Sequence, residues 1–582
     1  MGVFNPKMLD ASIRDVVSSL SNDRKTDVLL YALQHLPAGP SSRTIVENAV
    51  QSCLHIPSVY PQKVIQARLL RAKSRFSAGL RGAAHQDLQA ILLMDPTHAE
   101  ARALMPQAGS TRSEKSLSLP HGQPRFSPEL WREIASYLPR KDLRTLLFVP
   151  HALSTIASEL LFRDLHLQFG TSHFYAVNKS DEYSSDIDIW HAQRSADILA
   201  RLVSDQKYAS MVRVLHISAP HQSTNILTTF QIGILANVFP KLINLKSFGC
   251  IMGNEAMSSV LRILEKTHPR LPEINLKSTS DEPPVLPRLS NFNSFAYTTR
   301  RFPQGFITSL PDLFITLRSL NLEIQDGVIP AGIIAASNLT TLDLAGSFED
   351  TAVFSEILMH GNRLEVLRLR GKLGRTCTPS IAFRGRTAPL PCLREFVFSL
   401  TSVSRDFEDS DLFGAITDFV RKHPALKALK LLIYPDVHHV GYDASVWGVL
   451  PTLTELRLLH IVIPQDLSPA LSTWLIPRTV KYLSLSTSSI RNIGSMVSLW
   501  PGLPKGIKYL ALSSSSPADT ADVLHDSPLP DLRLLKLSSK LYTVVRAGND
   551  VILEEWPRRR MVFYLGDWLE RLECDDLPLS SF

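Results

Sequence analysis

The stretch that decides the fold is Leu364-Glu365-Val366-Leu367-Arg368-Leu369, together with its copies elsewhere in the chain. In each copy an apolar residue is followed by two variable residues, a second apolar residue, one variable residue and a third apolar residue. The pattern occurs thirteen times at intervals of 21 to 33 residues. Such self-similarity indicates a repeat architecture. The copies begin at Val212, Leu245, Leu271, Phe292, Leu317, Leu339, Leu364, Leu393, Leu426, Leu453, Val480, Ile507 and Leu532.

The end of each copy predicts a short β-strand, because its two apolar residues alternate with period two and point to one face. One unit cannot bury that face alone, but stacked units can, and their strands then form a parallel sheet. Several connections predict helices. The segment Asp411–His423 places Leu412 and Ile416 on one face. It stops before Pro424, and the segment Glu255–Thr267 behaves in the same way.

These features resemble the leucine-rich repeat family over about residues 212–540. The resemblance implies an α/β solenoid with the shape of a horseshoe, which is the fold class we expect. The Asn that usually follows the strand in this family is mostly replaced by Ser, Gly or an apolar residue. The sequence therefore does not predict how strongly or how evenly the solenoid is curved. The alternative is an ordinary doubly wound α/β domain, which is not expected to contain thirteen near-identical strand cores.

A short helical module precedes the repeats at residues 124–165. Its first helix is expected to begin after Ser127, a good N-cap residue, with Pro128 at the first helical position. Asp142 can cap a second helix, and a third is expected after Pro150. Three helices this short bury little surface, so the module is expected to need a partner. The apolar stripe of the first helix consists of Leu130, Ile134 and Leu138.

The order of residues in this module resembles an F-box. It reads Pro-Glu-Leu-Trp-x-x-Ile-x-x-Tyr-Leu, then Asp-Leu-x-x-Leu, then Val, then Leu-Phe-Arg-Asp-Leu. The resemblance implies binding to a Skp-type adaptor and, through it, to a cullin. One departure is Phe126, where the family usually has Leu. The alternative is a helical hairpin that only caps the repeats. The adaptor contacts that the resemblance implies are Pro128, Leu130, Ile134, Leu138, Leu143 and Val149.

The third helix of the module is expected to run directly into a first, capping strand. Phe162, Leu165 and Leu167 themselves fit the repeat pattern. A rigid junction suits a protein that holds its target at a fixed distance.

The N-terminal region resembles one tetratricopeptide repeat. Small residues at Ala72 and Ala84 allow two helices to approach closely, and Pro96 ends the second. Arg68 stands where the family has a large aromatic residue. We therefore expect a small helical, all-α domain. The expected division is a helical domain at 1–105, a linker at 106–123, the F-box at 124–165, the repeats at 166–545 and a C-terminal cap at 546–582.

Composition and charge exclude other classes. Hydrophobic residues make up 44% and charged residues 20% of the 582, as in ordinary globular proteins. The formal net charge of +7 favours acidic partners or serves solubility. The triplet Arg558–Arg560 is isolated, so no nucleic-acid arm is expected. The start of the chain lacks a signal-peptide pattern, and apolar stretches such as Val328–Ala336 are shorter than the roughly 20 residues of a membrane span. We expect an intracellular protein, cytoplasmic and/or nuclear, with no nucleic-acid or membrane partner.

No catalytic or cofactor motif is found. The five cysteines form no Cys-x-x-Cys pair. The stretch Gly371–Thr376 lacks phosphate-loop spacing and is expected to be a repeat loop. The pair His438-His439 has no cysteine or carboxylate pair at ligand spacing, so a surface loop is expected there. We expect no metal, no cofactor and no enzymatic activity.

The variable residues of the strands are expected to line the concave face. Arg and Tyr are enriched in binding hot spots, and the Arg fork suits phosphate or carboxylate. The hypothesis is that an acidic or phosphorylated segment of an unknown target binds there; the alternative is an ordinary solvated face. The residues in register include Arg368, Arg370, Glu395, Lys430, Glu455, Arg457, Tyr482, Tyr509 and Lys536. Of these, the target is expected to contact Arg368, Arg370, Lys430, Arg457, Tyr482 and Tyr509.

Two functions follow from these patterns. The first is a substrate-recognition subunit of a Skp–cullin–F-box ubiquitin ligase. The second is a leucine-rich repeat scaffold with no ligase role.

Overall fold

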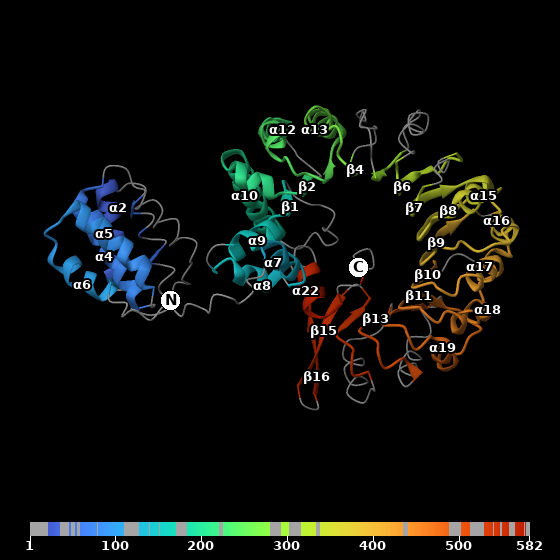
Figure 1. The fold of residues 1–582 in the computed structure, drawn as a ribbon. Coiled ribbons are helices and arrows are strands. Elements are labelled where there is room, and N and C mark those ends of the chain that lie inside the picture. Colours follow the sequence, from blue (N-terminus) through green and yellow to red (C-terminus); the bar gives the residue numbers. More distant parts are fainter. Residues whose placement is uncertain are drawn as a thin grey trace, which may run out of the picture. The chain divides into compact units, whose positions relative to one another are not determined.

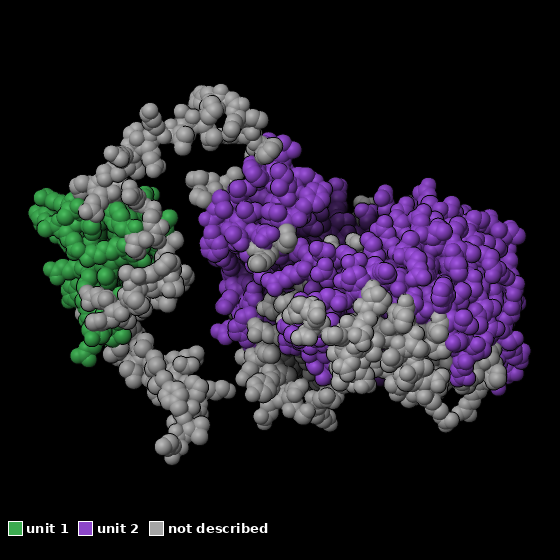
Figure 2. Space-filling model, turned by 90° about the horizontal axis from the view of Figure 1, so that it is seen from below, with its two compact units in different colours: residues 1–126 green, residues 127–582 purple. Residues whose placement is uncertain are grey.

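The computed structural model contains two compact units, residues 1–126 and 127–582, which Figure 2 colours separately. The pair His438-His439 and the triplet Arg558–Arg560 lie outside the described residues, as does the predicted linker from residue 110 onward. Residues 106–109 belong to a helix. The structure describes residues 21–34, 46–47, 50, 53–54, 59–77, 80–109, 127–138, 140–149, 152–169, 183–219, 225–279, 293–301, 316–332, 338–404, 406–434, 440–487, 502–512, 529–538, 540–547, 550–557, 565–574 and 577.

The first unit is helical. Ala72 and Ala84 are fully buried where α4 (Pro61–Ser77) and α5 (Arg81–Met94) pack together, as their small side chains predict. The buried carboxylate of Asp87 in α5 accepts hydrogen bonds from Arg71 (Nε, 2.9 Å) and Arg75 (Nη1, 2.7 Å). This buried ion cluster fixes α4 against α5, since removing one partner would leave an unpaired buried charge. The helices are α2 (Asn22–Gln34), α4 (Pro61–Ser77), α5 (Arg81–Met94) and α6 (Ala99–Gly109).

Among its described residues, the second unit contains one sheet of sixteen strands, whose order in the sheet is their order in the chain. Strands β1 to β14 are parallel, and the last two are antiparallel. The predicted α/β class is confirmed, and this order is compatible with a repeat solenoid. The strands are β1 (Asp164–Gln168), β2 (Val214–Ala219), β3 (Ser247–Met252), β4 (Glu273–Ser278), β5 (Ser294–Thr299), β6 (Ser319–Val328), β7 (Thr341–Phe348), β8 (Val366–Leu373), β9 (Glu395–Val403), β10 (Ala428–Ile433), β11 (Leu458–Ile463), β12 (Tyr482–Thr487), β13 (Tyr509–Leu512), β14 (Leu534–Leu537), β15 (Lys540–Ala547) and β16 (Asp550–Glu555).

The helices between the strands, from α10 (Tyr183–Ser204) to α19 (Pro469–Leu475), cover the outer side of the curved sheet (Figure 1). In α17 (Leu412–Arg421) the predicted apolar face is buried, with Leu412 and Ile416 fully enclosed. The helices from α10 to α19 and one face of the strands share a continuous core. The helices are α7 (Pro128–Ser136), α8 (Arg140–Leu146), α9 (Ala152–Leu161), α10 (Tyr183–Ser204), α11 (Gln206–Met211), α12 (Asn225–Val238), η2 (Phe239–Lys241), α13 (Asn254–Thr267), α15 (Thr351–His360), α16 (Pro379–Gly385), α17 (Leu412–Arg421), α18 (Ala444–Trp447), η3 (Leu450–Thr452), α19 (Pro469–Leu475) and α22 (Leu565–Arg571).

Two sequence predictions about where strands begin and end are wrong in detail. The copy beginning at Leu453 is displaced, because Leu459 and Ile461 pair with Leu429 and Leu431 of the preceding strand and face the core. The repeat therefore begins three residues later, at Leu456. Residues 371–373 belong to β8 and not to a loop.

Candidate functional site

The helices α7 to α9 form a small module around its own core of Ala135, Leu143 and Ile156. Helix α7 begins as the sequence predicts: Ser127 is the N-cap, and its hydroxyl accepts a hydrogen bond from the backbone N–H of Leu130 at 3.4 Å. This cap satisfies one of the free N–H groups at the start of the helix.

One face of α7 exposes large apolar side chains. Leu130, Ile134 and Tyr137 are 52%, 41% and 79% exposed. Their spacing of four and three residues places them on one stripe of the helix. Leu138 and Val149 are half-buried, and Pro128 begins the helix, although its side chain is not among those described. The stripe is a surface on which a protein partner can bury apolar area.

The remaining predicted contact of the module is differently placed. Leu143 is only 6% exposed and belongs to the module's own core, so it does not form part of the exposed surface. The stripe also includes Tyr137, which the sequence prediction did not select, and Phe148 after α8 is exposed as well. The sequence did contain a signal for Tyr137, because residues three apart on a helix, such as Ile134 and Tyr137, lie on the same face just as residues four apart do.

Only two residues, Phe162 and Arg163, connect the module to the sheet. Phe162 follows α9 and packs edge-on against Tyr208 of α11, with ring centroids 5.0 Å apart. Strand β1 begins at Asp164 and pairs in parallel with β2, and its Leu165 and Leu167 are buried in the sheet core. The predicted capping strand is thus present, and it fixes the position of α9 relative to the sheet.

One face of the strands points away from the core. The charged residues on that face form ion pairs with one another. Asp343 of β7 accepts hydrogen bonds from Arg370 (Nη2, 2.9 Å) and from Arg368 (Nη1, 3.4 Å). Arg368 also donates its Nε–H to the carboxylate of Glu395 in β9 at 2.7 Å. The two arginines that were expected to receive an acidic target are therefore already paired within the sheet.

The C-terminal segment covers the same face over the last strands. Tyr482 and Tyr509 are register partners in β12 and β13, and they are 4% and 3% exposed. The expectation that both line an open face is therefore wrong. The residues of this second core are Leu458, Tyr482, Tyr509, Ala511, Leu534, Leu541, Trp556, Leu569, Cys574 and Leu577.

The sequence contains a signal for this cover. In β11 the run Leu458–Ile463 is apolar at every position except His460. Such a run is typical of a strand that is buried on both faces. The apolar sequence of β11 therefore predicts that another segment covers the face of the last strands that points away from the main core.

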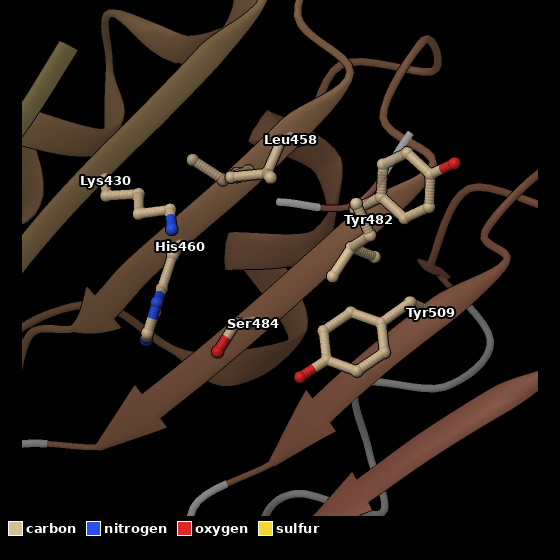
Figure 3. A pocket seen from close by; sticks show the side chains of 8 residues that line it. Lys430, Leu458, His460, Tyr482, Ser484 and Tyr509 are labelled. Carbon is tan, nitrogen blue, oxygen red and sulfur yellow. The ribbon is translucent and has the colours of Figure 1, made fainter. Parts of the chain in front are cut away.

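A small pocket lies at the border of the covered region (Figure 3). Lys430, His460 and Ser484 are register partners in β10, β11 and β12. Burial lowers the pKa of the Lys430 ammonium, and it lowers the pKa of His460 to about 3, with smaller contributions from Lys430 and Lys536. The space amounts to ≈ 10 Å³, which is about one water molecule.

Arg457 is not on the strand face to which the sequence pattern assigned it. It lies one residue before β11, and its backbone N–H donates to the carbonyl of Lys427 at 2.8 Å. The side chain of Arg457 is exposed. The displaced repeat frame of β11 is the reason for the difference.

Two stacked histidines predict a loss of stability in acid. His166 of β1 and His216 of β2 stack with ring centroids 4.7 Å apart. Burial lowers both pKa values, that of His216 to about 4, to which the charge of His166 also contributes. The unfolded histidine, with a pKa near 6.5, takes up its proton first as the pH falls. The stabilisation is therefore complete above about pH 6.5 and is lost as the pH falls towards 4.

We expect urea denaturation at pH 5 to give a free energy of unfolding about 1–2 kcal/mol lower than at pH 7 because of His216. His216→Gln should reduce this difference, since glutamine does not titrate. An unchanged difference in the variant would show that other groups cause the acid sensitivity.

In the described part of the chain, no helix is long and apolar enough to cross a bilayer. Among the same residues, no group of three or more His, Cys, Asp or Glu side chains is arranged to hold a metal ion.

The fold and these surfaces define an α/β protein with one long sheet built from stacked units. No family model and no curated protein matches the chain. Among solved structures, the crystal structure of a complex of Rad7 and Elc1 in yeast is similar to it, at 12% identity. The match covers 68% of this chain and 96% of that chain, with a TM-score of 0.28. A TM-score this low does not establish a common fold.

Proposed function

We propose that this chain is the substrate-recognition subunit of a Skp–cullin–F-box ubiquitin ligase. In this proposal residues 124–165 are an F-box that binds a Skp-type adaptor, which in turn binds a cullin. The sheet and its helices are leucine-rich repeats that bind the target protein. The chain presents the target in the cytoplasm, the nucleus or both, and it does not transfer ubiquitin itself.

The observation that carries this proposal is the exposed stripe on α7. Leu130, Ile134 and Tyr137 expose large apolar surface on a helix of nine residues. Exposed apolar patches mark interaction sites, because burying them on a partner is favourable. The stripe coincides with the sequence that resembles an F-box. The short connection of two residues from α9 to β1 adds support, since it would hold a target at a fixed distance from the adaptor.

One contact favours the scaffold alternative. The backbone N–H of Arg140 at the start of α8 donates to a carboxylate oxygen of Glu570 in α22 at 3.4 Å. The module and the C-terminal helix are therefore neighbours (Figure 1). A module that only caps the sheet would make such a contact.

Adaptor binding distinguishes the two functions. Leu130→Glu combined with Ile134→Glu is expected to weaken capture of a purified Skp-type adaptor about 100-fold or more, because two unpaired charges would be buried at the contact. Both side chains are exposed in the free chain, so folding should be preserved. Binding is measured by pull-down and by biolayer interferometry on the full chain.

The matched control is Leu471→Glu combined with Trp474→Glu in α19. These side chains are also exposed and apolar, and they lie outside the module. The control should bind the adaptor as well as the unmodified chain does. If the folded unmodified chain does not bind the adaptor, or if the α7 variant binds it equally tightly, the ligase role is wrong and the scaffold role remains.

A further inference from the structure

Six consecutive repeats carry a basic residue at the same place, immediately before the strand. From the second of these residues onward, the backbone N–H of each donates to the carbonyl of the one before, at 2.7 to 2.9 Å. These bonds hold neighbouring residues at the strand spacing of about 4.8 Å. The set, called the basic row below, runs along the side of the sheet where the N-terminal ends of β9 to β14 lie. It consists of Arg394, Lys427, Arg457, Lys481, Lys508 and Arg533.

The side chains of the basic row are available. Arg394, Arg457, Lys481 and Arg533 are exposed, and Lys427 and Lys508 are half-buried. Among the described residues, the row forms one ion pair, between Lys508 and Glu573.

The fold does not require a basic residue at this place. In earlier repeats the same position is occupied by Asn293, Thr340 and Glu365 as well as by the basic residues Arg213, Lys246 and Arg318, and all six make the same backbone hydrogen bond. Like charges on adjacent strands destabilise a sheet. Six basic residues on successive strands therefore lower the stability of the fold. The acidic residues Glu455 and Asp531 are not members of the row, since they precede Arg457 and Arg533 by two residues.

The chain itself shows what the row can bind. The Nζ of Lys508 lies 3.6 Å from a carboxylate oxygen of Glu573, and it donates a hydrogen bond to the backbone carbonyl of that residue at 3.0 Å. An acidic residue and its backbone thus occupy one position of the row already.

We infer that the basic row is the docking surface for an extended acidic segment of a partner protein. The identity of that partner as the ligase target rests on the proposed function. Five intervals of about 4.8 Å give a row of roughly 24 Å, which an extended peptide spans with about seven residues. Carboxylates every second residue would meet the row from one side. Arg368 and Arg370 are already paired with acidic residues of the sheet. The proposed docking surface therefore lies at the N-terminal ends of the strands and not at these two arginines.

An acidic peptide fits this row better than a nucleic acid. Single-stranded nucleic acids are bound by basic grooves together with aromatic side chains on which bases stack. The tyrosines nearest to the row, Tyr482 and Tyr509, are buried beneath the C-terminal segment. What remains is a high density of positive charge, which suits a run of carboxylates.

The test uses the full chain, without an adaptor, and a fluorescent peptide of about eight glutamates. Fluorescence anisotropy is expected to show binding that weakens with added salt. Arg457→Glu combined with Lys481→Glu should raise the apparent dissociation constant about tenfold or more, because two attractions become repulsions. The milder pair Arg457→Gln and Lys481→Gln should have a smaller effect of the same sign, and circular dichroism checks that both variants are folded.

The matched control is Arg213→Glu combined with Arg318→Glu. These exposed arginines occupy the same place in their repeats and make the same backbone bonds, but they lie outside the row. Their reversal should leave peptide binding within about twofold. Absence of peptide binding overturns the inference, and so does an equal loss in the control variant. Tighter binding to oligothymidylate or to phosphatidylserine vesicles overturns it as well.

This result is independent of the adaptor experiment. The row variants should still capture the adaptor, since Arg457 and Lys481 lie outside the module. Loss of adaptor binding by the unmodified chain would therefore refute the proposed function and leave the peptide result standing.

Discussion

Replacement of Phe383 by alanine is expected to lower the free energy of unfolding of the second unit by about 3–5 kcal/mol. Phe383 lies in α16 and is 1% exposed. Its ring connects three successive helices to the sheet, so the cavity left behind cannot be filled by movement of one neighbour. Urea denaturation followed by circular dichroism measures the change. The surrounding rings, with centroids 5.2 to 6.2 Å away, are Phe354, Phe396, Phe398 and Phe419.

The control for this prediction lies in the same helix. Ile381 of α16 is exposed, so Ile381→Ala should change the free energy of unfolding by no more than about 0.5 kcal/mol. Similar losses in the two variants would mean that α16 contributes through its helical stability and not through the aromatic cluster.

A second large effect is expected for Gly371→Ala. Gly371 has a φ of +153°, which favours glycine, and a Cβ there would lie 1.7 Å from the carbonyl oxygen of Gly346 in β7. The obstacle is backbone, which can move only if the pairing of β7 and β8 is disturbed. The register of β8 and β9 also shifts directly after Gly371. We expect a loss of about 3 kcal/mol or more, measured as above.

Gly233→Ala is the matched control for this substitution. Gly233 lies inside α12, and a Cβ there would have nothing within 4 Å. Alanine has the higher helix propensity, so this variant should gain about 0.5–1 kcal/mol. If Gly371→Ala were as stable as the unmodified chain, the close approach of β7 and β8 at this position would be wrong.

The sequence was sufficient to predict the strand cores, because apolar residues with period two identify their own face. Leu342 and Leu344 of β7 are fully buried as that period requires. The same logic failed at Leu453, since apolar residues on both faces of β11 leave two frames equally plausible. Only pairing with β10 decides between them.

The candidate binding surfaces could also be predicted from the sequence only in part. Leu130 and Ile134 are exposed as a docking stripe requires, whereas Leu143 is needed by the module's own core. The cover over Tyr482 and Tyr509 comes from residues far along the chain, which no local pattern connects to them. The basic row is visible only once the strand register is known, because its members are separated by irregular intervals in the sequence.

The two ends of the sheet also bear on solubility. A bare strand edge is a template for polymerisation, since its free N–H and C=O groups can pair with another chain. At one end α10 packs beside β1, and Ser195 accepts a hydrogen bond from the N–H of Gln168 at 2.8 Å. At the other, β16 reverses direction and exposes Glu554 and Glu555. A sheet of this length is thereby protected from end-to-end association into fibres.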